Sequence, residues 1–262
     1  MKLLTIGNPK TAKGLGLGYL TAVLHLAPSM LSGIVNVCSR ATAGCIAACL
    51  NTAGRGGIIR AGETTNAIQL CRIRRTELLV SHPLIFAGML SADIAELQRA
   101  AARHGMRPAL RLNGTSDLYW GWLANDLGKA WDAANVRPSR ASAVIRDIVA
   151  SACDAMPVYD YTKRPGLRAD YDAAGLPVHL TFSRAETAAN KRDAKAALAN
   201  GQNVAVVFST KRNVPLPATF GGFPVIDGDA HDLRFLDPAG VVVGLRAKGR
   251  ARKDATGFVV RV

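Results

Sequence analysis

The sequence predicts a single α/β domain over residues 1–262, with a partial or complete parallel barrel-like fold of about six strands. The chain has 49% hydrophobic and 20% charged residues, which suits a sizeable core and excludes disordered, collagen-like and coiled-coil classes. Short β-type runs alternate with helical stretches, and polar clusters follow several of those runs, as at the active face of parallel α/β proteins. An open doubly wound sheet is the alternative architecture.

Six runs predict strands, because each is short, apolar and bounded by polar residues, glycine or proline. The last of them is continuous and β-branched, which is typical of a strand buried on both faces. The first is followed by a long loop, residues 29–57, that carries three cysteines. The six predicted strands are residues 20–26, 109–112, 157–161, 178–182, 203–208 and 241–245.

Five stretches between these strands predict helices. The clearest is 92–104, with Ser91 as its N-cap and Gly105 as its terminator. The others are residues 64–79, 118–133, 142–152 and 185–200.

The charge balance favours an anionic partner. Lys and Arg total 33 against 19 Asp and Glu, a net charge of +14, so nucleic acid or a nucleotide is the expected partner class. Residues 14–39 contain no charged side chain, but His25, Pro28 and several glycines interrupt the run, so we expect no membrane span. Residues 1–9 have a Gly-Asn-Pro break where a signal peptide would be apolar, which predicts a cytoplasmic protein.

Cys38, Cys45 and Cys49 form the pattern C-x6-C-x3-C. One helix would place Cys45 and Cys49 on the same face, and Gly44 would let the loop bring Cys38 back toward them. Three thiolates suit a [4Fe-4S] cluster with one open iron, which is the interpretation we favour. Structural zinc would need a fourth ligand, and the cysteines can also be small buried side chains without metal; the two further cysteines, taken as structural, are Cys71 and Cys153.

Polar side chains at three strand ends are the candidate site. Asn113, Ser116 and Asp117 follow the strand 109–112, Asp160 and Lys163 lie at the end of the strand 157–161, and Ser183 follows the strand 178–182. An acid and an amine at one strand end can position a substrate or transfer protons, and a satisfied polar rim above the core is the alternative. The predicted catalytic residues are Asn113, Asp117, Asp160 and Lys163. His25 alternates with apolar residues and is expected to be a buried, hydrogen-bonded histidine.

Two other classes stay open. A basic nucleic-acid-binding protein with structural cysteines or zinc would use Arg72, Arg74 and Arg75, together with cations of the helix 185–200 and of residues 246–253. A divalent-metal nuclease would use Asp227, Asp229 and Asp232, although Asp-Gly is also an ordinary turn signal and we favour the turn.

Several sequence blocks resemble the phage gene product 88 domain family, and they are spread over nearly the whole chain. The blocks are Lys10-Thr-Ala-Lys-Gly14, Leu24-His-Leu-Ala-Pro28, residues 38–54, Arg111-Leu-Asn-Gly-Thr-Ser-Asp117, Tyr159-Asp-Tyr-Thr-Lys163, Val225-Ile-Asp-Gly-Asp229 and Arg234-Phe-Leu-Asp-Pro238. This resemblance implies a phage or prophage origin, and therefore the cytoplasm of the host, but little about chemistry.

A weaker resemblance, to radical S-adenosylmethionine enzymes, rests on three cysteines in the loop after the first strand of a partial barrel. It implies that the open iron and nearby polar residues hold S-adenosylmethionine, with Asn113, Ser116, Asp117 and Ser183 as cofactor-binding residues. The cysteine spacing here differs from the usual C-x3-C-x2-C, and Asn113-Gly-Thr-Ser-Asp117 stands where that family has Gly-Gly-Glu. The leading hypothesis is a phage-type iron–sulfur enzyme that acts on a nucleotide, nucleic acid or other anionic substrate.

Overall fold

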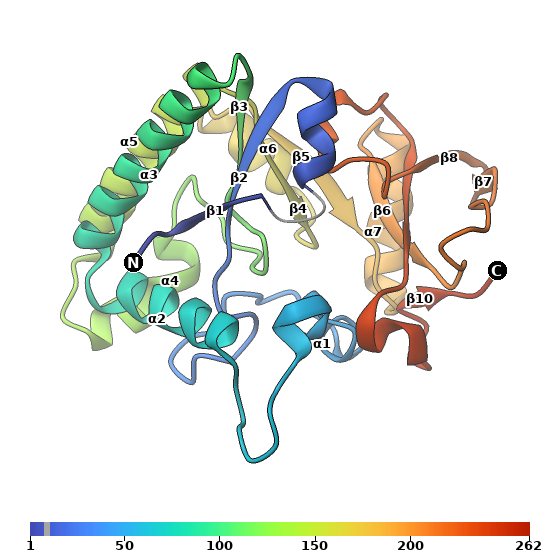
Figure 1. The fold of residues 1–262 in the computed structure, drawn as a ribbon, viewed down its shortest axis with the longest axis horizontal. Helices are drawn as coiled ribbons and strands as arrows, with labels where there is room; N and C mark the ends of the chain where they lie inside the picture. Colours follow the sequence, from blue (N-terminus) through green and yellow to red (C-terminus); the bar gives the residue numbers. More distant parts are fainter. Residues whose placement is uncertain (8–10) are drawn as a thin grey trace. The chain divides into compact units, whose positions relative to one another are not determined.

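A computed structural model describes residues 1–7 and 11–262; Asn8, Pro9 and Lys10, which the sequence analysis used, lie outside the described residues. The strands form a ten-stranded, mostly parallel sheet in the order β1-β2-β3-β4-β5-β6-β9-β8-β7, with β10 paired to β6 (Figure 1). The predicted mixed α/β class is confirmed, whereas the predicted number of strands is too low. The strand path has β1 and β7 at its ends, and closure into a barrel stays a prediction.

All six predicted strands are present. Four others were missed, because three of them have only two or three residues and β8 contains a proline and is largely unburied. Since β1 precedes the first predicted strand, the cysteine-bearing loop follows the second strand rather than the first. The strands are β1 Leu4–Ile6, β2 Tyr19–Leu24, β3 Arg107–Arg111, β4 Val158–Thr162, β5 Val178–Ser183, β6 Val204–Phe208, β7 Thr219–Phe220, β8 Phe223–Asp227, β9 Val242–Arg246 and β10 Val259–Val260.

The five predicted helices are also present, with changed ends. The helix predicted at 92–104 begins at Pro83, where proline suits the first turn, so Ser91 is an internal residue and not the N-cap. The helix predicted at 118–133 begins only at Ala124. The α-helices are α1 Ala43–Ala47, α2 Ala67–Ser81, α3 Pro83–Arg103, α4 Ala124–Ala133, α5 Pro138–Ala155, α6 Leu167–Ala173 and α7 Ala188–Ala199; the 3-10 helices are η1 Thr11–Leu17, η2 Leu50–Thr52, η3 Gly54–Gly57, η4 Arg234–Leu236 and η5 Gly249–Lys253.

The chain divides into two compact units. The first comprises Met1–Ser39, Leu70–Asp160 and Gly166–His179, and the second comprises Arg40–Gln69, Tyr161–Pro165 and Leu180–Val262. Cys38 therefore belongs to the first unit, and Cys45 and Cys49 belong to the second.

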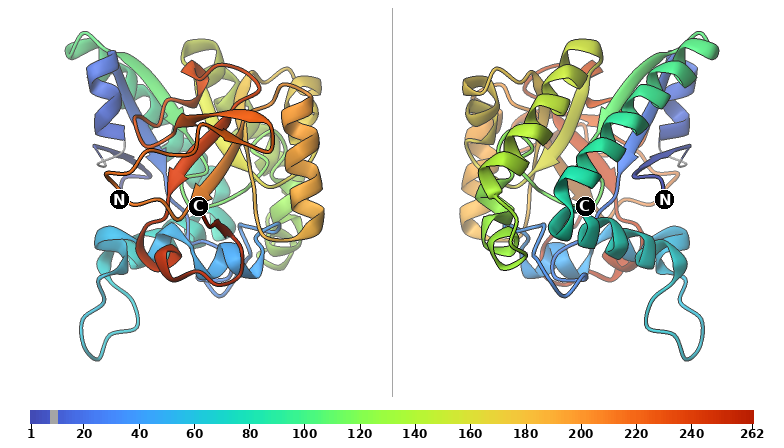
Figure 2. Two further views of the ribbon diagram at one scale, coloured as in Figure 1. Left: turned by 90° about the vertical axis from the view of Figure 1, so that its right-hand side faces the viewer. Right: turned by 90° about the vertical axis from the view of Figure 1, so that its left-hand side faces the viewer.

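In the first unit, α3 and α5 lie side by side and pack with β2, β3 and β4 in one apolar core (Figure 1, Figure 2). Leu20, Ala22 and Leu24 of β2 belong to this core. Because side chains alternate along a strand, Thr21 and Val23 lie on the opposite face of β2. The candidate site lies beyond the carboxyl end of β2, on this opposite face.

In the second unit, α7 packs on β6 and shares a core with Phe182, Val206 and Val242. A separate small cluster joins Ala48, next to α1, to Ala251 of η5 and Phe258.

Candidate functional site

The loops that follow β2 and β3 are joined by hydrogen bonds. Val23 and Arg111 are partners in the parallel register, and beyond them the backbone N–H of Gly114 donates to the Leu24 carbonyl oxygen at 2.9 Å. A β-carbon at position 114 would lie 2.6 Å from that oxygen and 2.8 Å from Cδ2 of His25. Only glycine therefore lets the second loop pack directly against the histidine.

Asn113 organises this loop through every polar atom of its side chain. Its Oδ1 accepts hydrogen bonds from the Ser116 hydroxyl at 2.8 Å, the Leu118 N–H at 3.0 Å and the Trp120 indole N–H at 3.1 Å. Its Nδ2 donates to the Leu118 carbonyl oxygen at 3.0 Å and to Asp160 at 3.3 Å. Because the amide is saturated by the protein itself, Asn113 and Ser116 act here as structural residues of the loop.

Asp160 of β4 is buried next to the same loop. Its Oδ1 accepts the Asn113 backbone N–H at 2.8 Å and lies 3.7 Å from Nε of Arg111. Burial raises the pKa of the Asp160 carboxyl to about 7, although the Arg111 charge and the backbone hydrogen bonds act in the opposite direction. The predicted neighbours Asn113, Asp117 and Asp160 are thus brought together within the first unit.

His25, directly after β2, lies among arginines. Thr76 of α2 accepts the Ala27 N–H at 2.9 Å and donates to the Arg72 carbonyl oxygen at 3.0 Å, which places that turn of α2 at the end of β2. Burial lowers the pKa of His25 to about 3, and the charges of Arg72, Arg111 and Arg75 lower it further in that order. His25 is therefore a neutral imidazole at pH 7 in strongly positive surroundings.

The three arginines predicted to bind nucleic acid do not share one exposed face. Arg75 is buried, and its guanidinium donates to the Lys2 carbonyl oxygen from Nε at 3.1 Å and Nη2 at 2.8 Å. Arg74 is exposed, and Arg72 is half-buried near His25. Arg75 thus holds the N-terminal segment, whereas Arg72 belongs to the candidate site.

The predicted helix through Cys45 and Cys49 is wrong, because α1 ends at Ala47 and Cys49 is the N-cap of η2, where its Sγ accepts the Asn51 N–H at 3.5 Å. Cys38 donates from Sγ to the Thr115 carbonyl oxygen at 3.5 Å. None of the five cysteines forms a disulfide bond. Within residues 1–7 and 11–262, no three His, Cys, Asp or Glu side chains are grouped as ligands of one metal ion.

Two of the predicted strand-end residues, Lys163 and Ser183, lie in the second unit. Nζ of Lys163 donates to the Ser183 hydroxyl at 2.9 Å and lies 5.7 Å from the centre of the Phe258 ring. In the same unit, Glu186 accepts the Thr42 hydroxyl at 2.6 Å and the Gly44 N–H at 2.9 Å at the start of α1.

Two of the three aspartates of the nuclease hypothesis, Asp227 and Asp229, are paired with cations. Nη1 of Arg246 lies 2.9 Å from Asp227, and Nζ of Lys248 lies 2.7 Å from Asp229. The Asp229 N–H donates to Asp227 Oδ1 at 2.9 Å, which closes a local turn. This arrangement favours the turn interpretation over a metal site. After this turn, residues 234–236 form η4.

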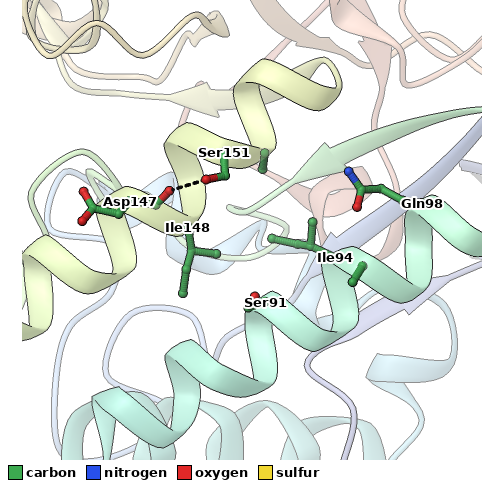
Figure 3. A pocket seen from close by; sticks show the side chains of 8 residues that line it. Ser91, Ile94, Gln98, Asp147, Ile148 and Ser151 are labelled. Carbon is green, nitrogen blue, oxygen red and sulfur yellow. Dashed lines mark hydrogen bonds between the residues drawn. The ribbon is translucent and has the colours of Figure 1, made fainter.

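In the first unit, a groove of ≈ 330 Å³ lies between α3 and α5 (Figure 3). Its lining includes Ile94, Ile148 and the hydroxyl of Ser151, which donates to the Asp147 carbonyl oxygen at 3.0 Å. None of the predicted site residues lines it.

Sequence reasoning missed the association of Arg111 and Arg72 with His25. The sequence signal for Arg111 was its position in the otherwise apolar predicted strand 109–112, two residues before Asn113. Side chains two residues apart in a strand lie on the same face. The position of α2, which brings Arg72 to the same place, depends on the Thr76 contact and has no sequence signal.

No helix in the described part of the chain is long and apolar enough to cross a membrane. No curated protein and no solved structure matches the chain. A model of the family described as Gene product 88 matches residues 2–262, nearly the whole chain, in agreement with the sequence blocks and the phage origin they imply. The protein therefore belongs to the Gene product 88 family.

Proposed function

We propose that the first unit binds a phosphate-bearing ligand, of the nucleotide class, at the carboxyl ends of β2 and β3. The observation that carries this proposal is the positive charge of Arg72 and Arg111 near His25, a neutral and partly exposed imidazole at the end of β2. Ligands of parallel α/β proteins bind at this end of the strands. Guanidinium groups bind phosphate oxygens in pairs.

Two further features support an occupant of this face. The hydroxyl of Thr21 is buried, has no hydrogen-bond partner among the described residues, and lies on the same face of β2 as Val23 and His25 by strand alternation. Buried hydroxyl groups are ordinarily paired, so this one suits a polar ligand or water. Asp160 faces Arg111 and holds its guanidinium in place.

The test uses the intact protein and isothermal calorimetry with inorganic phosphate, pyrophosphate and deoxynucleoside triphosphates. Arg72→Gln is expected to weaken binding by about tenfold or more, because a charge-assisted hydrogen bond is lost. Arg74→Gln removes the same charge two residues along α2 from an exposed side chain and is expected to leave binding unchanged. Equal losses in both variants, with folding intact by circular dichroism, would contradict the proposal.

A second experiment separates binding by Arg111 from its structural role. Arg111→Gln alone leaves Asp160 without its cation, so the double variant Arg111→Gln/Asp160→Asn keeps the local charge balanced. We expect the double variant to fold and to bind pyrophosphate weakly. Undiminished binding would exclude Arg111 from the site.

The iron–sulfur enzyme of the radical S-adenosylmethionine type, with its partial barrel, is a second proposal. It is supported by the position of Cys38 in the loop after β2, with its thiol against the loop that follows β3. Iron, sulfide and zinc content of protein purified without oxygen tests it. About four irons per chain, lost in Cys45→Ala, would support the cluster; neither metal after attempted reconstitution would overturn it.

A further inference from the structure

The segments 54–60 and 249–253 of the second unit carry five exposed cations. Arg55 and Arg60 lie in the loop before α2, and Arg250, Arg252 and Lys253 belong to η5. In the described part of the chain, none of the five forms an ion pair, whereas the nearby Lys248 is paired with Asp229. We call these five residues the basic surface.

Packing joins the two segments that supply the basic surface. Gly249, the first residue of η5, has a φ of +55°, and a β-carbon there would lie 3.2 Å from Cα of Ala53. Ala53 directly precedes η3, which contains Arg55, and Gly249 directly precedes Arg250. The close approach of the two backbones therefore places cations of both segments next to each other.

The loop that carries Arg60 is braced at its stem. Nδ2 of Asn66 donates to the carbonyl oxygens of Arg55 at 3.2 Å, Gly56 at 3.0 Å and Ile58 at 2.9 Å. Nε2 of Gln69 donates to the Gly56 carbonyl oxygen at 2.8 Å. These hydrogen bonds fix the backbone of residues 55–58 at the base of the loop, and the rest of the loop extends away from it (Figure 1, Figure 2). Ile58, 67% exposed, is presented beside the cations.

Acidic residues are scarce in the two segments that carry the basic surface. Residues 40–69 contain one, Glu63, and residues 246–262 contain one, Asp254. Asp254 is buried, and its Oδ2 accepts the N–H groups of Val259 at 2.9 Å and Gly257 at 3.2 Å. The two segments thus carry much more positive than negative charge, and the exposed Ile58 lies between Arg55 and Arg60 in the sequence.

We propose that the basic surface binds duplex DNA. Five cations suit the phosphate backbone, and an exposed isoleucine flanked by arginines suits the floor of the minor groove. Single-stranded DNA is a poorer fit, because such sites stack bases on aromatic side chains. Residues 40–69 contain no aromatic residue, and the one aromatic of residues 246–262, Phe258, is buried. The proposal does not depend on the ligand of the first unit.

The test is fluorescence anisotropy of a labelled 30-base-pair duplex with the full chain, between about 50 and 200 mM salt. For five phosphate contacts, the logarithm of the affinity should fall with the logarithm of salt with a slope of about −4.5. The variant Arg250→Gln/Arg252→Gln/Lys253→Gln should bind at least tenfold more weakly, with a slope smaller by about 2.7. Ile58→Ala should weaken binding severalfold without changing the slope.

The matched control is Lys191→Gln/Arg192→Gln/Lys195→Gln on α7, which removes the same three charges from another exposed part of the same unit. It should keep the wild-type slope to within about one unit. An equal loss in this control would show non-specific attraction by net charge and overturn the proposal. Equal or tighter binding of the single strand, or preferential binding of anionic phosphatidylserine vesicles at the same salt, would overturn it as well.

Discussion

Asp160 accepts the backbone N–H of Asn113 at 2.8 Å, and so joins the loop after β3 to the neighbouring strand β4. The same carboxylate faces the Arg111 guanidinium, so the polar loop and the cationic site share one buried residue. Changes to the loop should therefore affect both stability and the charge state of the site.

The Asn113 side chain is expected to contribute strongly to stability. Asn113→Ala removes the acceptor of three buried donors and should lower the free energy of unfolding by about 3 kcal/mol or more, because each unsatisfied buried group costs about 1–3 kcal/mol. Urea denaturation followed by circular dichroism measures this. Asn125→Ala, at an exposed position of α4, is the control and should change stability by less than about 0.5 kcal/mol.

Gly114 is expected to be sensitive to the smallest substitution. Gly114→Ala forces a methyl group against the Leu24 carbonyl oxygen and His25, and overpacking of this kind costs about 1–3 kcal/mol. The melting temperature should fall. Gly128→Ala in α4, where a β-carbon meets nothing within 4 Å, should instead raise it, because alanine favours helix. A stable Gly114→Ala protein would show that the two loops are not packed together.

Asp160 and His25 should make the free energy of unfolding depend on pH in opposite directions. The folded pKa of Asp160 is raised, so its stabilising contribution is full below pH 3.8 and is lost as pH rises to about 7. The folded pKa of His25 is lowered, so its contribution is full above pH 6.5 and is lost as pH falls toward 3. Between about pH 4 and 6.5, the changes that the two residues cause in the free energy of unfolding per pH unit nearly cancel.

Single variants isolate the contribution of each residue to the pH dependence of the free energy of unfolding. Relative to the wild type, Asp160→Asn should lose stability as pH is lowered from 6.5, and His25→Asn should gain it as pH is lowered from 7, each by at most about 1.4 kcal/mol per pH unit. Urea denaturation at a series of pH values measures both. Parallel curves for the wild type and Asp160→Asn would mean that Asp160 titrates normally in the folded protein.

The Asp227 and Asp229 pair should not respond to divalent metal. Both carboxylates already face Arg246 or Lys248, so Mg²⁺ at millimolar concentration and its removal by chelator should leave the melting temperature unchanged. Lys248→Ala provides the comparison, since it removes one of the two cations at Asp229, which keeps Arg246 at 3.6 Å. A magnesium-dependent stabilisation of the wild type would restore the nuclease hypothesis.

The sequence predicts the longer strands and helices of the fold. β6 and most of β9 are short apolar runs bounded by polar residues, a pattern that is visible in the sequence without knowledge of the neighbouring strands. The strands β7 and β10, with two residues each, owe their existence to pairing with a neighbour. Trp120 and Trp131, which follow Asn113 in the sequence, are fully buried in the core of the first unit.

The candidate site was predictable only where its residues are close in sequence. Asn113, Ser116 and Asp117 share one loop, so their association follows from proximity. The arginines of α2 were grouped for the same reason, but a helix turns 100° per residue and sends Arg72 and Arg74 to different surroundings. Long-range contacts such as that between Thr76 and Ala27 are set by packing, which no local pattern encodes.

The brace that Asn66 provides has an evolutionary consequence. Because the stem of the loop is held through backbone carbonyl groups, most side chains between Ile59 and Thr65 can change at little folding cost; Gly62, with a φ of +81°, is the exception. Related proteins can then vary this segment while the scaffold stays the same. Sequence drift in this family should concentrate at residues 59, 61 and 63–65, whereas Asn66, Gly62 and Arg60 of the basic surface should be retained.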